Sequence, residues 1–426
     1  MSSDVTLLDT ALDKARYIAT GLLLCFTSQQ AFAGSFQLHE QSVTYLGNAF
    51  SGTASTAEDA STGYYNPAGL PLLKNPQIVV SGIYYHGTIK LYNAHATNNL
   101  GANVASNPTS WPVSSALVPG VHLSANINKN WSVGIGVVAP FGLSTKYNST
   151  SIARYMATKS EIQTIDITPS VAYKINCQWS VGAGFDAMHV KTVLDSDIFF
   201  GSEGYVKNNG HAWTYGYHLG VLFQASKDTR MGLVYYSLFN PHIHAKVSTL
   251  GYPSASKPTS SSSTVNLPDR IVYSITHMYS DQWTGVGDVE WVHWSRLQSL
   301  TVNYNNNTAT YIPMFGKNTW RVSLGANYKY SECLLFKGGI AYDESPIRTV
   351  YRIAPLPDSD RYWIALGVKY KVYKQLSFDV AYAHLFFKKC SIQETGTVNG
   401  VVRQTLYGNY KSSADLVGIQ LTWNFV

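Results

Sequence analysis

The chain has 426 residues, of which 13% are charged and 13% are aromatic, and its formal net charge is +6. The charged share is about half of the roughly 25% usual for soluble domains. The longest uninterrupted apolar run, 22–26, is far shorter than the about 20 residues that a membrane helix needs. These values argue against a helical membrane protein, and the lack of basic runs or nucleic-acid motifs argues against a nucleic-acid partner.

Low charge combined with many aromatic residues is typical of a transmembrane β-barrel. In such a barrel, lipid-facing and lumen-facing residues alternate, so hydropathy averages out along each strand. The mean hydropathy of −0.07 agrees with that averaging. A soluble β-rich protein is the alternative that composition leaves open.

Residues 1–33 have the pattern of a secretory signal peptide. Lys14 and Arg16 supply positive charge, a short apolar core follows, and Ala31-Phe32-Ala33 forms a small-x-small cleavage site. Cleavage there leaves Gly34 as the first mature residue. Cys25 suggests lipoprotein processing instead, but the residue before it is bulkier than that cleavage normally needs.

Residues 34–75 are small, polar and rich in turn formers, and strand-like sequence begins only at about Gln77. Pro67 removes a backbone donor and Asn66 can bond the local backbone, so a tight turn is expected there. The segment also carries more apolar residues than disordered tails usually have, namely Phe36, Leu38, Leu46, Phe50, Tyr64 and Tyr65. A compact plug and a disordered tail are the two interpretations.

From residue 76 to the end, six short polar turns alternate with seven longer polar segments. The short turns lie at 128–130, 176–178, 226–228, 280–282, 331–333 and 373–375, and the longer segments near 91–115, 142–160, 199–210, 247–266, 301–316, 345–359 and 391–406. Short turns at one end and long loops at the other are typical of outer-membrane barrels. Thirteen connections predict fourteen antiparallel strands, with both chain ends on the periplasmic side.

The segments between these turns alternate as strands do. In residues 361–372, Tyr362, Ile364 and Leu366 share one face, whereas Arg361 and Trp363 share the other. A period of two with apolar residues on one face indicates a strand, and aromatic residues near strand ends fit the membrane interfaces. The predicted fold class is therefore all-β, a 14-stranded transmembrane barrel over residues 76–426.

The width of such a barrel decides between the two interpretations of residues 34–75. About eight strands is the size at which strand side chains fill the interior, so fourteen leave it open. We therefore predict that residues 34–75 form a plug inside the lumen. Arg321 and Arg361 fall on the lumen face of their strands, where they either pair with acidic wall residues or meet a carboxylate of a ligand.

The stretch GSFQLHEQSVTYLGNAFSGTASTAEDASTGYYNPAGL, residues 34–70, resembles the mature N-terminus and hatch of the FadL family of outer-membrane transporters for long-chain fatty acids and hydrocarbons. The resemblance is collinear over nearly the whole mature chain, and it continues through residues 137–147, 288–295, 338–347, 356–370 and 379–386. It implies capture of an apolar molecule in an extracellular groove, passage to a pocket above the hatch, and sideways exit through the barrel wall.

The resemblance also implies roles for three groups of residues. These are ligand contact for Gly34, Ser35, Phe36 and Leu38, a hatch turn at Asn66, Pro67 and Ala68, and a wall kink at Pro140, Phe141 and Gly142. Proline at the kink deletes a ladder bond, and the less favoured alternative is that Pro140 merely ends a strand at the loop.

The sequence thus predicts a FadL-family transporter in the bacterial outer membrane that binds a long-chain fatty acid or other hydrophobic small molecule. We expect a monomer, inserted by the barrel-assembly machinery among outer-membrane lipids and lipopolysaccharide, with no cofactor and no enzymatic activity. Aromatic hydrocarbon uptake and a passive porin-type channel are the alternatives. A hydrolase is disfavoured because no nucleophile-elbow motif is present, and a metal pair at His242 and His244 lacks a third ligand nearby.

Overall fold

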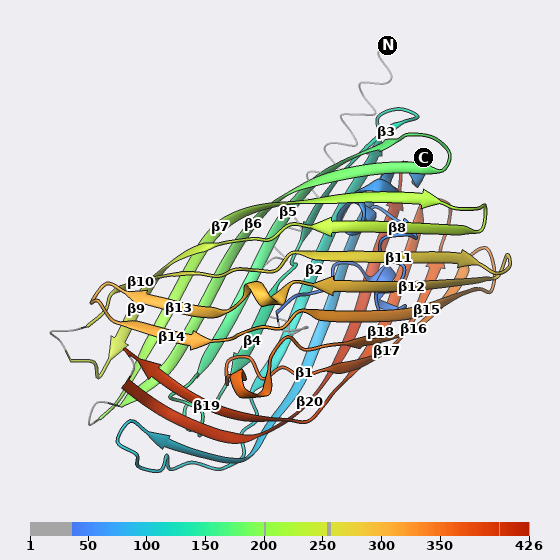
Figure 1. Cartoon of the computed structure of the whole chain (residues 1–426). Helices are drawn as coiled ribbons and strands as arrows, with labels where there is room; N and C mark the ends of the chain where they lie inside the picture. The colour runs from blue at the N-terminus through green and yellow to red at the C-terminus, as the bar shows by residue number, and fades with distance from the viewer. Residues whose placement is uncertain (1–35, 200–201, 254–256, 400, 426) are drawn as a thin grey trace.

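The computed structural model describes residues 36–199, 202–253, 257–399 and 401–425. The predicted signal peptide, Gly34 and Ser35 lie outside these residues. The strands form one antiparallel sheet that curls into a barrel around the N-terminal part of the chain (Figure 1). Among the described residues, no helix combines the length and hydrophobicity required to cross a membrane.

Within the described part of the chain, the wall consists of twenty strand segments. They are β1 Gln77–Asn98, β2 Val113–Asn126, β3 Trp131–Val138, β4 Gly142–Lys146, β5 Lys159–Lys174, β6 Trp179–Phe199, β7 Glu203–Gln224, β8 Thr229–Tyr236, β9 His242–Leu250, β10 Ser260–Thr264, β11 Arg270–Met278, β12 Trp283–Val292, β13 Ser299–Tyr304, β14 Ala309–Pro313, β15 Thr319–Lys329, β16 Leu334–Asp343, β17 Arg361–Lys371, β18 Leu376–Phe387, β19 Cys390–Val398 and β20 Val401–Asn424.

A stave is defined here as one full strand of the barrel wall. Six staves are interrupted and consist of two segments in line: β3 with β4, β8 with β9, β10 with β11, β12 with β13, β14 with β15, and β18 with β19. Counting each pair once leaves the fourteen predicted strands. The ladder between β1 and β20, from Gln77↔Asn424 to Asn98↔Gln404, closes the barrel. The predicted all-β, 14-stranded fold is confirmed, and all six predicted short turns connect neighbouring staves.

The predicted strand faces are confirmed as well. In β17 the side chains of Arg361 and Trp363 are buried, whereas Tyr362 and Leu366 are 49% and 65% exposed on the outside. The outer surface of the barrel is therefore apolar where the predicted alternation is strongest, and the polar positions of the same strands face the lumen.

Several segments that the sequence predicted as loops are strands. Residues 203–210 belong to β7, and most of 391–406 belongs to β19 and β20, so these hairpins are longer than the sequence predicted (Figure 1). The physical reason is that a hairpin outside the membrane meets water on both faces and loses its apolar alternation. Its backbone ladder needs no such pattern and continues.

The lumenal segment, residues 36–73, lies inside the barrel. It contains three short helices, α2 Val43–Leu46, α3 Thr62–Tyr65 and η2 Pro67–Leu72, and two further 3₁₀ turns, η4 Trp294–Arg296 and η5 Thr349–Tyr351, follow strands of the wall. The segment donates hydrogen bonds to well-separated staves, from Ser42 to Gln420 of β20 (2.8 Å), from Gly52 to Asp288 of β12 (2.6 Å), and from Asn66 to the Val221 carbonyl of β7 (3.1 Å). It therefore reaches across the lumen.

Apolar contacts accompany these polar ones. Leu46 and Phe50 of the lumenal segment belong to one buried cluster with Ile83, Trp363 and Leu416 of the wall. The ring of Phe50 meets that of Trp363 edge-on, with centroids 6.1 Å apart. Full burial of such side chains is worth about 1.5–3 kcal/mol each, so packing contributes to holding the segment in place.

Close approach between segment and wall depends on a glycine in β16. A Cβ atom at Gly339 would lie 2.2 Å from the backbone carbonyl of Asn48, a distance that real contacts do not reach. A Cβ at the neighbouring Gly338, on the outer face, would meet only the side chain of Leu366 at 3.7 Å. Glycine at position 339 thus permits the contact between the two backbones. Position 338 has room for a side chain and plays no part in that contact.

We predict that Gly339→Ala loosens the lumenal segment whereas Gly338→Ala does not. The added methyl group must displace the backbone at Asn48, and overpacking of this kind typically costs about 1–3 kcal/mol. Amide hydrogen exchange of residues 46–52 in detergent should accelerate about tenfold or more in the first variant only. Equal exchange rates in the two variants would show that the close approach at Gly339 does not restrain the segment.

Candidate functional site

The wall is interrupted where β3 gives way to β4. Val138 pairs with Asp166 and Gly142 with Gln163, so three residues, 139–141, stand opposite two residues of β5. The extra residue makes a bulge. Thr164 compensates on the β5 side, since its Oγ accepts from the Phe141 amide at 3.0 Å and donates to the Phe141 carbonyl at 2.5 Å.

On its other side the bulge faces a gap in the ladder. β2 pairs with β3 as far as Val121↔Val137 and with β4 only at Val113↔Lys146. Between these two points, no strand pairing of the described residues joins β2 to 138–145. Pro119 lies on the facing edge of β2 and has no amide hydrogen to offer. Pro119 cannot be recognised from the sequence, because its role depends on which strand lies opposite.

The start of the lumenal segment provides partners for the bulge. The Leu38 amide donates to the Pro140 carbonyl and the Gly142 amide donates to the Phe36 carbonyl, both at 2.8 Å. Gln37 forms an antiparallel bridge with Phe141. Residues 36–38 therefore act as a short added strand along the interrupted part of the wall.

Gln41, which the sequence analysis did not single out, strengthens this attachment. Its side-chain amide donates to the Ala139 carbonyl at 2.9 Å and accepts from the Ala139 amide at 2.8 Å. His122 of β2 lies 3.0 Å from the Gln41 carbonyl. One residue of the lumenal segment thus contacts both edges of the gap.

Phe36 lies in an apolar cluster that it forms with residues of the wall. Its ring meets Trp294 edge-on at 5.0 Å and lies 6.3 Å from Phe141. The buried members of this cluster come from many staves: Phe36, Phe141, Leu143, Met188, Val190, Phe239, Leu267, Val292, Trp294, Leu297, Met314, Ile347, Ile353 and Leu356. An apolar ligand chain that is buried among these side chains gains about 0.8 kcal/mol of binding free energy per CH₂ group.

A pocket opens among the long loops, toward the end of the barrel opposite the short turns. Apolar and aromatic residues form much of its lining, including Met156, Ile312, Val350, Tyr351 and Ile353. Ile353 also belongs to the apolar cluster around Phe36. The pocket and the cluster are therefore connected through a shared side chain.

Both predicted arginines are buried and already engaged. Arg361 contacts Asp343 at 2.9 Å and Asp358 at 3.4 Å. Arg321 donates instead to the lumenal segment, to the Ala49 carbonyl at 2.5 Å. The Arg361 contacts agree with pairing to acidic residues, whereas Arg321 bonds the lumenal segment and forms no ion pair among the described residues. Contact of either arginine with a substrate carboxylate stays a prediction.

Two carboxylates of β12 bind the lumenal segment, and the sequence could place them only on the lumen face. Asp288 accepts from the amides of Gly52 at 2.6 Å and Thr53 at 3.0 Å. Glu290 accepts from Gln37 Nε2 at 2.9 Å and lies 2.7 Å from His39. One strand thus holds both the beginning and the middle of the segment.

The Asn66-Pro67-Ala68 turn lies at the opposite end of the segment from Phe36. Asn66 donates to the Ala54 carbonyl at 2.7 Å and accepts from the Ala68 amide at 3.1 Å. Gly220 of β7 lies opposite, and a Cβ there would lie 2.0 Å from Asn66 Oδ1, so any larger residue would displace the Asn66 side chain. Ser180 of β6 donates to the Ala68 carbonyl at 2.6 Å. The turn is thereby bonded both to itself and to the wall.

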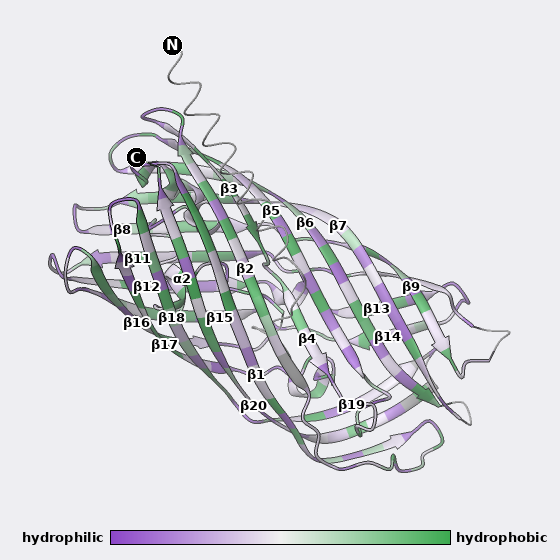
Figure 2. Cartoon of the chain, turned by 180° about the vertical axis from the view of Figure 1, so that it is seen from behind, coloured by the Kyte–Doolittle hydropathy of each residue, from purple (hydrophilic) through white to green (hydrophobic). Residues whose placement is uncertain are grey.

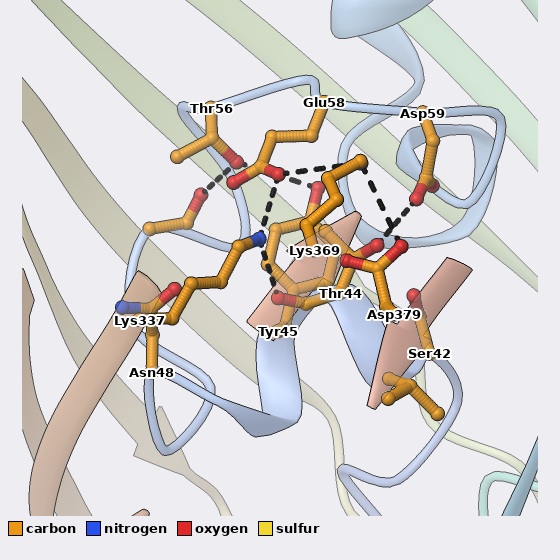
Figure 3. Close-up of polar contacts among 12 residues, drawn as sticks. Ser42, Thr44, Tyr45, Asn48, Thr56, Glu58, Asp59, Lys337, Lys369 and Asp379 are labelled. Atoms are coloured by element: carbon orange, nitrogen blue, oxygen red, sulfur yellow. Dashed lines mark hydrogen bonds and ion pairs between the residues drawn. The ribbon is translucent and has the colours of Figure 1, made fainter. Parts of the chain in front are cut away.

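Charged residues join the middle of the segment to β16 and β17, and Asp379 of β18 lies beside them. Figure 3 shows Lys337 and Lys369 reaching from the wall toward Glu58. Lys337 Nζ donates to Glu58 Oε2 at 2.7 Å and to the Thr44 carbonyl at 2.9 Å, whereas Lys369 lies 3.8 Å from both Glu58 and Asp379. Buried charges need such partners to offset the cost of desolvation.

Glu40 is an exception among the buried carboxylates of the lumen. It is 1% exposed, and neither side-chain oxygen has a hydrogen-bond partner among the residues that the structure describes. Burial raises the pKa of Glu40 to about 7, although nearby backbone amides, Arg361 and Arg321 act in the opposite direction. A carboxyl whose pKa is raised on folding binds its proton more tightly in the folded protein, so its packing is most favourable in acid.

We predict that Glu40→Gln removes a pH dependence of stability. Stability of the parent should fall as pH rises from about 4.5 to about 7, because the carboxyl ionises while buried. The loss is on the order of 3 kcal/mol, from about 1.4 kcal/mol per pKa unit. The variant should match the parent near pH 4.5 and unfold at a higher temperature at pH 8. Glu332→Gln, at an exposed turn, is the control, and parallel pH profiles for parent and Glu40→Gln would contradict the prediction.

The chain resembles known proteins over almost its whole length. The sequence model of the family described as "Outer membrane protein transport protein (OMPP1/FadL/TodX)" matches residues 24–425. The chain is 27% identical over 418 residues to the long-chain fatty acid transport protein of Escherichia coli O6:H1, which covers 88% of this chain and 92% of that protein. It is 29% identical over 454 residues to outer membrane protein P1 of Haemophilus influenzae, with 96% and 98% covered.

Solved structures have the same fold. A Pseudomonas aeruginosa FadL homologue superposes with a TM-score of 0.86 at 22% identity, over 92% of this chain and 100% of that one. The toluene transporter TbuX of Ralstonia pickettii gives 0.66 at 19% identity, over 93% and 99%. Together with the sequence relatives, these similarities confirm the predicted outer-membrane location and barrel fold.

Proposed function

Because the chain belongs to the outer membrane protein transport protein family (OMPP1/FadL/TodX), we propose that it takes up long-chain fatty acids, or other hydrophobic molecules, through the bacterial outer membrane. The observation that carries this proposal is the wall bulge at 139–141, which lies beside the buried apolar cluster and is covered from inside by residues 36–41. Relatives named as fatty acid and toluene transporters support both cargo classes.

The proposed path begins at the pocket among the long loops and continues to the cluster around Phe36. From there the cargo leaves sideways between β2 and the β3–β4 stave, where no ladder of the described strands has to be broken. Sideways exit suits an apolar molecule, since it moves from protein into hydrocarbon and never crosses water. The bonds that Phe36, Leu38 and Gln41 make to the bulge are the ones that would have to open.

The lumenal segment is proposed to block flow along the barrel axis. Its bonds to β7, β12 and β20 support this role, and so does its near-complete burial. We also propose that the protein works as a monomer after insertion by the barrel-assembly machinery, because the β1–β20 ladder closes the sheet without a partner. The proposed activity is transport, with no catalytic step.

Deleting residues 34–70 should separate a transporter from a passive porin. We predict that the deleted protein still inserts as a barrel and conducts ions readily in a planar bilayer, because an open fourteen-stranded lumen is wide. The intact protein should conduct little. If the intact protein conducts as strongly as the deletion variant, the porin alternative is correct and the lumenal segment does not close the lumen.

A second test concerns sideways exit. Deleting Pro140 removes the one extra residue of the bulge, which should allow β3 and β4 to pair continuously with their neighbours. We predict that cellular uptake of labelled oleate then falls about tenfold or more, while binding of a fluorescent fatty acid to purified protein changes little.

Pro140→Ala is the matched control, because it keeps the residue count and hence the bulge. Its uptake should stay close to that of the parent at equal surface expression. Full uptake by the variant that lacks Pro140 would mean that cargo does not leave through this part of the wall, even if the protein is a transporter.

A further inference from the structure

The outer face of β6 and β7 carries several aromatic levels, among them the stacked pair Phe185 and Tyr215, and two of these levels mark its ends. Trp179 stacks on Phe223 near the short turns, with centroids 4.3 Å apart, and Trp213 lies 5.1 Å from His189 nearer the loops. Ten residues of β6, from 179 to 189, separate the two levels. At about 3.3 Å per residue and a tilt of about 40°, this is about 25 Å across the membrane, the height of the apolar band in such barrels.

Basic side chains gather immediately beyond the upper aromatic level. The basic patch consists of His189, Lys191, His211, His244 and Lys246, on β6, β7 and β9, and these strands lie side by side (Figure 2). The register places Lys191 opposite His211, His211 opposite His244, and Asn209 opposite Lys246. Lys191, His211, His244 and Lys246 are exposed on the outside of the barrel.

The protein does not neutralise the two lysines of this patch. Among the described residues, neither Lys191 nor Lys246 forms an ion pair. The nearest acidic residues on the same face are engaged elsewhere or lie farther out, since Glu161 pairs with Lys159 and Asp195 stands opposite Lys207. The patch therefore presents uncompensated positive charge at the upper edge of the apolar band.

We propose that the basic patch binds the phosphate groups of lipid A, the membrane anchor of lipopolysaccharide. The loop end of an outer-membrane barrel faces the lipopolysaccharide leaflet, so the patch lies where acyl chains end and phosphorylated sugars begin. Lysine binds phosphate as a compact point charge, and basic residues at this depth strengthen lipid attachment through charge. The inference depends on the outer-membrane location and does not depend on the cargo.

The test compares two variants with equal loss of charge. Lys191→Gln combined with Lys246→Gln removes the lysines of the patch. Lys174→Gln combined with Lys227→Gln removes two lysines near the short turns, where lipopolysaccharide is absent. Full-length proteins in detergent are titrated with bis-phosphorylated lipid A, with dephosphorylated lipid A and with phosphatidylglycerol, and binding is followed by native mass spectrometry.

We expect the patch variant to bind bis-phosphorylated lipid A about tenfold or more weakly than the parent, and the control variant to bind as the parent does. The parent should also prefer bis-phosphorylated lipid A over the dephosphorylated form and over phosphatidylglycerol. Equal binding of phosphorylated and dephosphorylated lipid A, or equal weakening in both variants, would each overturn the proposal.

Discussion

Inside a membrane every backbone N–H and C=O group must find its partner within the protein, because hydrocarbon offers none. The ladder between β1 and β20 meets this demand for the sheet as a whole. At the bulge at 139–141 the regular ladder is interrupted, so Thr164 of β5 provides side-chain partners and Phe36, Leu38 and Gln41 provide further partners from inside. The requirement that closes the wall thus also ties the N-terminal segment to it.

Hydrogen bonds and ion pairs accompany apolar packing between segment and wall, and these polar contacts have a physical consequence. Asp288 and Glu290 bind amides and side chains of the segment through charge-assisted bonds with defined directions, so only a narrow set of positions satisfies them. Such groups can exchange their partners for water when the segment moves, at a modest net cost. An apolar contact of the same size would have to expose its surface to water.

The inner face of the wall meets the lumen and the outer face meets lipid. Polar and apolar positions therefore alternate along each strand. Inward positions of β17 hold Arg361 against Asp343 and leave room for packing around Trp363. Outward positions meet acyl chains, then the membrane interface, and finally the polar outer leaflet. Where the outer face of β6, β7 and β9 becomes basic, the height of the apolar band determines which lipid groups those charges can reach.

The sequence by itself determined the number of strands, the faces they expose and the end of the barrel that carries long loops, because each is a local pattern of alternation and turn residues. It also marked Phe36, Pro140 and the Asn66 turn, which the family resemblance covers. Only the tertiary structure decided that Gln41 contacts Ala139, that Asp288 and Glu290 bind the lumenal segment, and that Gly220 faces Asn66. These contacts join residues distant in the chain, and they follow from the register of the closed sheet, which no short stretch of sequence contains.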